Sequence, residues 1–197
     1  MDVMFKLKLF FLKLKERVLK TGSKWDLLAP EEDTAILFAH QHINDEPEKM
    51  LDEHHYSPEY VLAHYGAKIN YRFRAIQANE DDINIQKRIS LNSADCNLVL
   101  YRGVGKEVFH MMHENAKPFP DGDLLEKSFL QCSLVKGRES SGTFKLRIYV
   151  AKGTPLIYLG NVNDEQFFYE VDIQSGALLK IISADSTYLN CQLLQTD

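Results

Sequence analysis

The chain has 197 residues, of which 45% are hydrophobic and 26% are charged, enough for one domain with a substantial core, and no apolar run approaches the length of a membrane-spanning helix. The net charge of −5 is unevenly spread, because residues 1–24 carry seven Lys and Arg side chains against two acidic ones and leave the remaining chain at −10. An acidic body argues against a general nucleic-acid binder, although a local basic rim could still admit a strand of RNA or DNA.

The basic segment over residues 1–24 is the first element of the chain. Lys6, Lys8, Lys13 and Lys15 interrupt its apolar run too often for a secretory signal, so we expect no signal peptide and a cytoplasmic location, in the producer or in a target cell. Three alternatives stay open: an amphipathic helix on a membrane surface, a segment that docks on a partner, and the first element of the fold. Basic residues on opposite sides of the helical wheel favour the last two over a membrane anchor.

Residues 25–90 have helical patterns. Ser57 suits an N-cap and Pro58 suits the first position of the helix that follows. The predicted helices are one that begins at the acidic residues 31–33, one over Tyr60–Ile76 and a shorter one over Ile83–Leu91.

Strand patterns dominate from Asn97 onward. Alternation from Phe144 to Val150 predicts one strand, and Leu178–Ile182 predicts another. Between them, alternation predicts a strand with Phe167, Tyr169, Val171 and Ile173 on one face and Phe168, Glu170 and Asp172 on the other. Helices followed by strands predict an α+β fold with a mostly antiparallel sheet, and we expect residues 25–197 to form its single domain.

Polar side chains interrupt three apolar strand patterns. Arg102 closes a buried strand and could clamp a phosphate or carboxylate, while Gly103 after it lets a ligand approach the backbone. A second strand places Phe129, Gln131 and Ser133 on one face, and the third carries Glu170. Considered alone, each of these polar side chains is explained more simply as an ordinary hydrogen-bonded residue than as part of a functional site.

Histidine and cysteine spacing gives no metal signature. The chain has seven histidines and three cysteines, but no histidine has a partner at zinc-ligand spacing with Cys or acidic support in the sequence. We therefore expect no metal and place the histidines on helix surfaces. The odd number of widely spaced cysteines is typical of a reducing compartment.

Together and in this order, the polar segments resemble the R-S-E class of mono-ADP-ribosyltransferases, which includes many bacterial toxins and effectors. The resemblance is spread over residues 60–183. It rests on five segments: Ile69–Arg74, Leu100–Val104, Phe129–Leu134, Ile148–Thr154 and Glu170–Gly176. It implies N-terminal helices packed on a two-sheet β core around a cleft for NAD.

The resemblance also implies roles for individual residues. Glu170 would be the catalytic carboxylate, supported by Arg102, Ser133 and Gln131. The residues expected to bind NAD are Arg102, Gly103, Asn70, Arg74, Phe129 and Arg138. The residues expected on the acceptor side are Phe168, Asn163 and Glu165.

Two departures from the family pattern concern the acceptor and the catalytic glutamate. Phe168 stands where the family usually has Glu or Gln, which argues against arginine as the acceptor. Gln131 stands where the family has the serine that orients the glutamate, and its amide could donate the same hydrogen bond.

The resulting prediction is a transferase that cleaves NAD and moves ADP-ribose to a macromolecular acceptor, either a protein side chain or a base of RNA or DNA. The alternatives are an NAD glycohydrolase with the same site and an inactive relative that acts as a binding module. By analogy with the family, a toxin, effector or defence protein is expected, and an antitoxin or immunity partner is conceivable.

Overall fold

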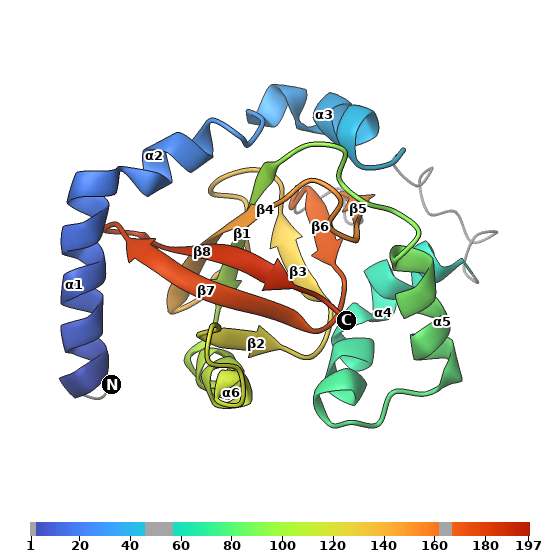
Figure 1. Cartoon of the computed structure of the whole chain (residues 1–197). Helices are drawn as coiled ribbons and strands as arrows, with labels where there is room; N and C mark the ends of the chain where they lie inside the picture. Colours follow the sequence, from blue (N-terminus) through green and yellow to red (C-terminus); the bar gives the residue numbers. More distant parts are fainter. Residues whose placement is uncertain (1–2, 46–56, 162–166) are drawn as a thin grey trace.

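The computed structural model describes residues 3–45, 57–161 and 167–197. Most helices come first in the chain and all strands follow residue 97, as the sequence pattern predicted (Figure 1). The helices are α1 (Val3–Leu19), α2 (Thr21–Asp26), the 3-10 helix η1 (Glu32–Thr34), α3 (Ala35–His42), α4 (Pro58–Arg74), α5 (Glu80–Ile89) and α6 (Lys106–Ala116). The strands are β1 (Leu98–Val104), β2 (Leu124–Glu126), β3 (Leu130–Ser133), β4 (Phe144–Val150), β5 (Leu156–Gly160), β6 (Glu170–Ile173), β7 (Ala177–Ala184) and β8 (Tyr188–Gln195).

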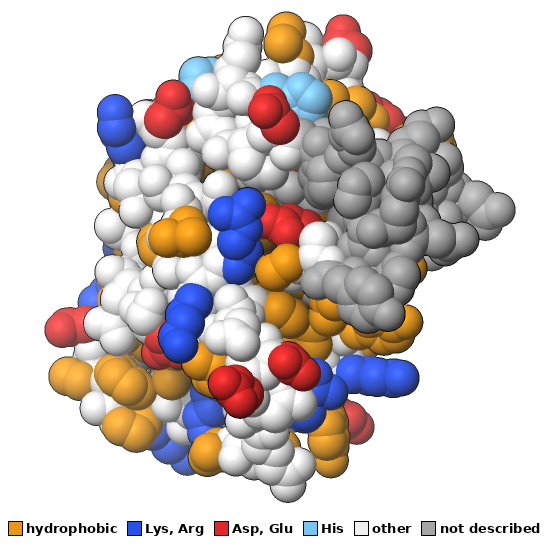
Figure 2. All heavy atoms as spheres, turned by 90° about the vertical axis from the view of Figure 1, so that its right-hand side faces the viewer, with side chains coloured by type: hydrophobic (Ala, Val, Ile, Leu, Met, Phe, Trp, Pro, Cys, Tyr) orange, Lys and Arg blue, Asp and Glu red, His pale blue; other side chains and the backbone are white. Residues whose placement is uncertain are grey.

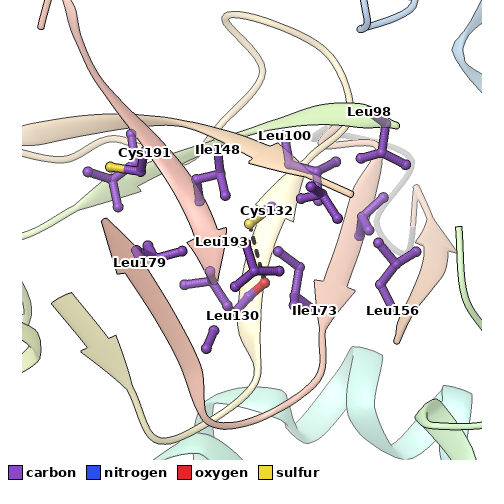
Figure 3. Close-up of a cluster of buried hydrophobic side chains, with 14 of the residues drawn as sticks. Leu98, Leu100, Leu130, Cys132, Ile148, Leu156, Ile173, Leu179, Cys191 and Leu193 are labelled. Carbon is purple, nitrogen blue, oxygen red and sulfur yellow. Dashed lines mark hydrogen bonds between the residues drawn. The ribbon is translucent and has the colours of Figure 1, made fainter. Parts of the chain in front are cut away.

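The strands form one continuous sheet in the order β2-β7-β8-β4-β1-β3-β6-β5, rather than two separate sheets. Neighbouring strands are antiparallel except for β4 and β8, which are parallel. The sheet curves so strongly that β7 and β8 pass in front of β1 and β3 (Figure 1). Apolar side chains from these two layers meet in a common core, where Leu179 and Leu193 lie with Leu130 and Ile173 (Figure 3).

Helices α4 and α5 start where their capping residues predict. The Ser57 hydroxyl accepts a hydrogen bond from the Tyr60 backbone N–H at 3.1 Å, and Pro58 is the first residue of α4, so the predicted N-terminus is confirmed. Helix α5 begins earlier than predicted because Asn79 and Asp82 form a capping box.

The strand predicted around Glu170 is shorter than the alternation indicated. Phe167 and Tyr169 have φ angles of 47° and 49°, a left-handed conformation outside the extended range of a β-strand, so β6 begins at Glu170 itself. Each such residue costs about 1–2 kcal/mol. The Leu134 backbone N–H donates to the Tyr169 carbonyl at 2.9 Å and helps to hold this conformation.

Helix α1 packs on β7. Phe5, Leu9 and Leu12 contact the main core. Glu16 accepts hydrogen bonds from the Ser183 hydroxyl at 2.6 Å and the Asn190 amide at 3.0 Å, which attaches the end of the helix to β7 and β8. Among the helices of the described ranges, none combines the length and apolarity that crossing a bilayer requires.

Candidate active site

Glu170 is the first residue of β6 and lies opposite Ser133 of β3. The same antiparallel pairing places Gln131 opposite Asp172, so Gln131 is the diagonal neighbour of Glu170. The Gln131 amide nitrogen donates to the Glu170 carboxylate at 3.1 Å. The hydrogen bond expected from the sequence is therefore present, and it fixes the orientation of a carboxylate on a rigid strand.

A cavity of about 200 Å³ opens in front of this pair. Its wall is formed by the ends of β1, β3 and β6 and by the segment that follows β3. Six residues singled out in the sequence line it: Arg102, Gln131, Ser133, Arg138, Phe168 and Glu170. Residues distant in the chain thus come together, and the cavity combines a carboxylate, guanidinium groups and an exposed aromatic ring.

Arg102 is held in place from behind by a buried carboxylate. Its guanidinium donates to the Gln131 carbonyl and lies 4.0 Å from Glu126. Glu126 is fully buried and accepts two hydrogen bonds from Arg74, at 3.0 and 2.7 Å. Arg102 keeps one buried N–H, at Nε, for which the described residues supply no hydrogen-bond partner. These contacts fix the orientation of the guanidinium, while its Nε–H has no acceptor among the described residues.

The charge of Glu126 is maintained by these arginines. Burial alone would raise the pKa of its carboxyl group, but the hydrogen bonds from Arg74 and the positive charges of Arg74 and Arg102 bring that pKa below its usual value. Glu126 is therefore an ionised link between the end of α4 and the arginine in the cavity.

Glu170 and Asp172 form a coupled pair of carboxyl groups. Burial raises the pKa of Glu170, against the opposing effects of the Gln131 hydrogen bond and of the Arg102 charge. Asp172 is fully buried, and burial followed by the negative charge of Glu170 raises its pKa well above the usual value. Glu170 therefore ionises first, with Asp172 still protonated beneath it.

Replacing Asp172 by Asn is expected to stabilise the protein at neutral pH. Because the pKa of Asp172 is higher in the folded than in the unfolded state, its contribution to stability is present at acidic pH and is lost as pH rises through the raised pKa. Each pH unit between the two pKa values is worth about 1.4 kcal/mol. Urea unfolding between pH 4 and 8 should show that the free energy of unfolding of D172N increases relative to that of the wild type as pH rises. Curves of unfolding free energy against pH that run parallel for the two proteins would contradict this prediction.

Four of the residues predicted to bind NAD do not line the cavity. Phe129 is fully buried against Phe73, Asn70 is buried within α4, and Arg74 is bound to Glu126. Gly103 is packed against the Ser140 carbonyl, which lies 1.7 Å from the position that a Cβ atom would take. The glycine is therefore required by a neighbouring backbone segment of the protein itself.

Ser133 and Arg138 line the cavity but already have partners. The Ser133 hydroxyl donates to the Val135 carbonyl at 2.8 Å and accepts from the Val135 N–H at 3.1 Å. Arg138 forms a bidentate ion pair with Glu32, with its shortest contact at 2.6 Å. Asn163 and Glu165, predicted on the acceptor side, lie outside the described residues.

Three residues that support the site without lining its cavity were not identified as site residues in the sequence. A Cβ atom at Gly66 of α4 would lie 2.9 Å from the Gln131 amide nitrogen, so the glycine lets the helix approach the site. Its position inside a helical pattern was the available signal. Asp172 in an apolar strand was a second signal. Glu126 follows two leucines in a short strand and had none.

A group of His42, Asp95 and Cys96 lies away from this cavity. The His42 Nδ1 atom is 2.8 Å from an Asp95 carboxylate oxygen, and the ligand atoms of all three residues lie within 4.8 Å of one another. Sequence spacing gave no acidic or Cys support for any histidine, because His42 and Asp95 are far apart in the chain. The fold therefore brings an acidic side chain and a cysteine close to His42, which the spacing along the sequence did not show.

The sequence matches no protein-family model and has no significant match among curated proteins. The fold, in contrast, is similar to solved structures. The C3 exoenzyme of Clostridium limosum superposes with a TM-score of 0.59 at 15% identity, over 84% of this chain and 95% of that one. Plx2a, an ADP-ribosyltransferase toxin of Paenibacillus larvae, gives 0.51 at 17% identity, over 93% and 98%. C3stau2 of S. aureus, solved with NAD, gives 0.53 at 14% identity, over 70% and 85%. The chain therefore has the fold of the ADP-ribosyltransferase toxins, as its motifs predicted.

Proposed function

We propose that this chain is a mono-ADP-ribosyltransferase that cleaves NAD and transfers ADP-ribose to a macromolecular acceptor. The observation that supports this most directly is the contact between Gln131 and Glu170 in a cavity that also contains Arg102. A carboxylate and a guanidinium in one cavity suit a substrate that carries both a pyrophosphate and a ribose that becomes cationic.

Glu170 supplies the electrostatic part of the proposed reaction. Cleavage of the bond between nicotinamide and ribose builds positive charge on the sugar, as in glycoside hydrolysis. A carboxylate that is already oriented stabilises that charge without reorganisation. Because the ionised form is needed, the rate should fall as pH falls through the raised pKa of Glu170.

The residues of the cavity fit one end of NAD. A volume of about 200 Å³ is smaller than the roughly 300–1,000 Å³ that encloses a drug-sized ligand, so we infer that it takes the nicotinamide and its ribose. Arg102 lines the cavity and supplies positive charge for the anionic part of NAD. Arg138 can exchange Glu32 for a phosphate at little cost, because both side chains are 43% exposed and their ion pair is screened by water.

The acceptor is proposed to be a protein. Phe168, which lines the cavity, and its chain neighbour Phe167 are 37% and 47% exposed and suit an amphipathic or apolar contact. On the described part of the face that carries α4 and α5, basic, acidic and hydrophobic side chains are interspersed, and no continuous basic stripe follows a path that a nucleic-acid strand could take (Figure 2).

The test is to incubate the protein with labelled NAD and a cell lysate, then to digest one portion with protease and another with nuclease. Macromolecular label that protease removes and nuclease leaves supports a protein acceptor, whereas the reverse pattern overturns that choice. Nicotinamide release with free ADP-ribose and no labelled macromolecule would indicate a glycohydrolase. No release of nicotinamide would contradict the proposed activity altogether.

A further inference from the structure

Helix α1 carries a second apolar face, and the side chains of this face are largely exposed. Its buried side packs on the core through Phe5, Leu9 and Leu12. On the opposite side, five apolar side chains follow at three- and four-residue intervals, and each is between 49% and 77% exposed. These five residues, the α1 stripe, are Met4, Leu7, Phe11, Leu14 and Val18. Soluble surfaces rarely expose a continuous apolar patch without an interaction that uses it.

Basic side chains border the α1 stripe on both sides. With 3.6 residues per helical turn, the two borders are Lys8 and Lys15 on one side, and Lys6, Lys13 and Arg17 on the other. These five side chains are exposed, and only Lys8 has an ion-pair partner among the described residues, Asp123 at 2.5 Å. Glu16, the single acidic residue within α1, points toward Ser183 and Asn190. The exposed half of the helix is therefore apolar along its centre and positive along both edges.

A cavity beside α1 has the same combination of chemistry. It measures about 600 Å³ and lies between α1 and α6, with Met4 and Lys8 belonging to both the cavity and the helix surface. Phe109 and Phe144 contribute an apolar wall, and Lys106 is one of the basic residues that also line it. An acyl chain and an anionic headgroup would find matching surfaces here.

We propose that the α1 stripe docks on the surface of an anionic lipid bilayer. The apolar side chains enter the boundary of the acyl region, and the long basic side chains reach the headgroup phosphates. Residues 25–197, with a net charge of −10, are repelled overall by such a surface, so contact is limited to α1 and the cavity beside it. This proposal does not depend on the proposed enzymatic activity.

The charges favour a bilayer over a second copy of this chain. Two copies packed through the α1 stripe would bring their basic borders together, and like charges in contact are unfavourable. A bilayer instead offers opposite charge on both sides of the stripe. Helix α1 lies at the edge of the molecule opposite α4 and α5 (Figure 1). A chain docked through α1 would therefore hold α4 and α5 away from the membrane.

The test is co-sedimentation of the full chain with vesicles of phosphatidylcholine alone and with about 30% phosphatidylserine. We expect binding to the anionic vesicles that weakens with salt. The double variant F11D/L14D should lose at least about tenfold in affinity, and K6Q/K13Q/R17Q should lose on the order of 100-fold. NAD cleavage in solution should not change in either variant, because none of these residues lines the active-site cavity.

Leu91→Asp is the matched control, because Leu91 is 76% exposed but follows α5 and is not part of α1. It should bind vesicles like the wild type. Equal sedimentation of F11D/L14D and wild type, or equal binding to neutral and anionic vesicles, would overturn the proposal. So would a dimer in sedimentation velocity that F11D/L14D dissociates, if no vesicle binding accompanies it.

Discussion

Replacing Glu170 by Gln is expected to lower the rate of NAD cleavage by about 10²–10³-fold, the usual effect of removing one electrostatic group at a developing charge. Gln keeps the size of the side chain and removes only its negative charge. Because partial burial raises the pKa of Glu170 and so disfavours its charged form, the neutral substitute should not destabilise the fold. Nicotinamide release under saturating NAD measures the rate, and thermal unfolding measures the fold.

The control for this variant is Glu107→Gln on α6, an exposed carboxylate that does not line the cavity. It removes the same charge from the protein without changing the site, so its rate should equal that of the wild type. A Glu170→Gln protein that is folded and as active as Glu107→Gln would remove Glu170 from the mechanism. If both variants lost activity equally, net charge would be responsible instead.

Replacing Glu126 by Gln is expected to lower the free energy of unfolding by about 3–5 kcal/mol, because it leaves buried arginine charge without its partner. Glu126 is 0% exposed and is bound by Arg74, with Arg102 at 4.0 Å and the Ser128 hydroxyl at 2.8 Å. Its pKa is below the usual value, so the stabilisation that it contributes is present at neutral pH and is lost as pH falls through that lowered pKa. Urea unfolding at pH 7 measures the loss.

Glu114→Gln provides the comparison for Glu126. Glu114 also pairs with a basic residue, Lys117, but both side chains are exposed, so water screens the pair and its loss should hardly change stability. The difference in stability between the two variants should shrink at acidic pH, where the buried carboxyl group becomes protonated. Equal stability of the two variants at pH 7 would contradict the role assigned to Glu126.

The helices that the sequence predicted best are those with local start signals. Ser57 and Pro58 specify the beginning of α4 through contacts within one turn, so no tertiary information is needed. Strand β4 likewise follows from alternation between Phe144 and Val150. Helix α6 and strands β2, β5 and β8 were not predicted, because their short apolar runs suit several structures until neighbours select one.

The departures around β6 have a tertiary cause. Alternation treated Phe167 and Tyr169 as strand residues, yet both adopt positive φ where the chain enters the sheet. The Tyr169 backbone N–H donates to the side-chain oxygen of Asn161 at 2.9 Å, and the Tyr169 hydroxyl lies 3.4 Å from the Glu32 carboxylate. Contacts with distant segments outweigh the local preference of aromatic residues for extended backbone.

The sequence by itself determined the class of fold and the strands that carry Arg102, Gln131 and Glu170, because motif order and alternation are local properties of the chain. Only the tertiary structure decided that Glu126 is an ionised partner of Arg74 and Arg102, and that burial beside Glu170 raises the pKa of Asp172. Burial and charge act between groups that only folding brings together, and no spacing along the chain records them.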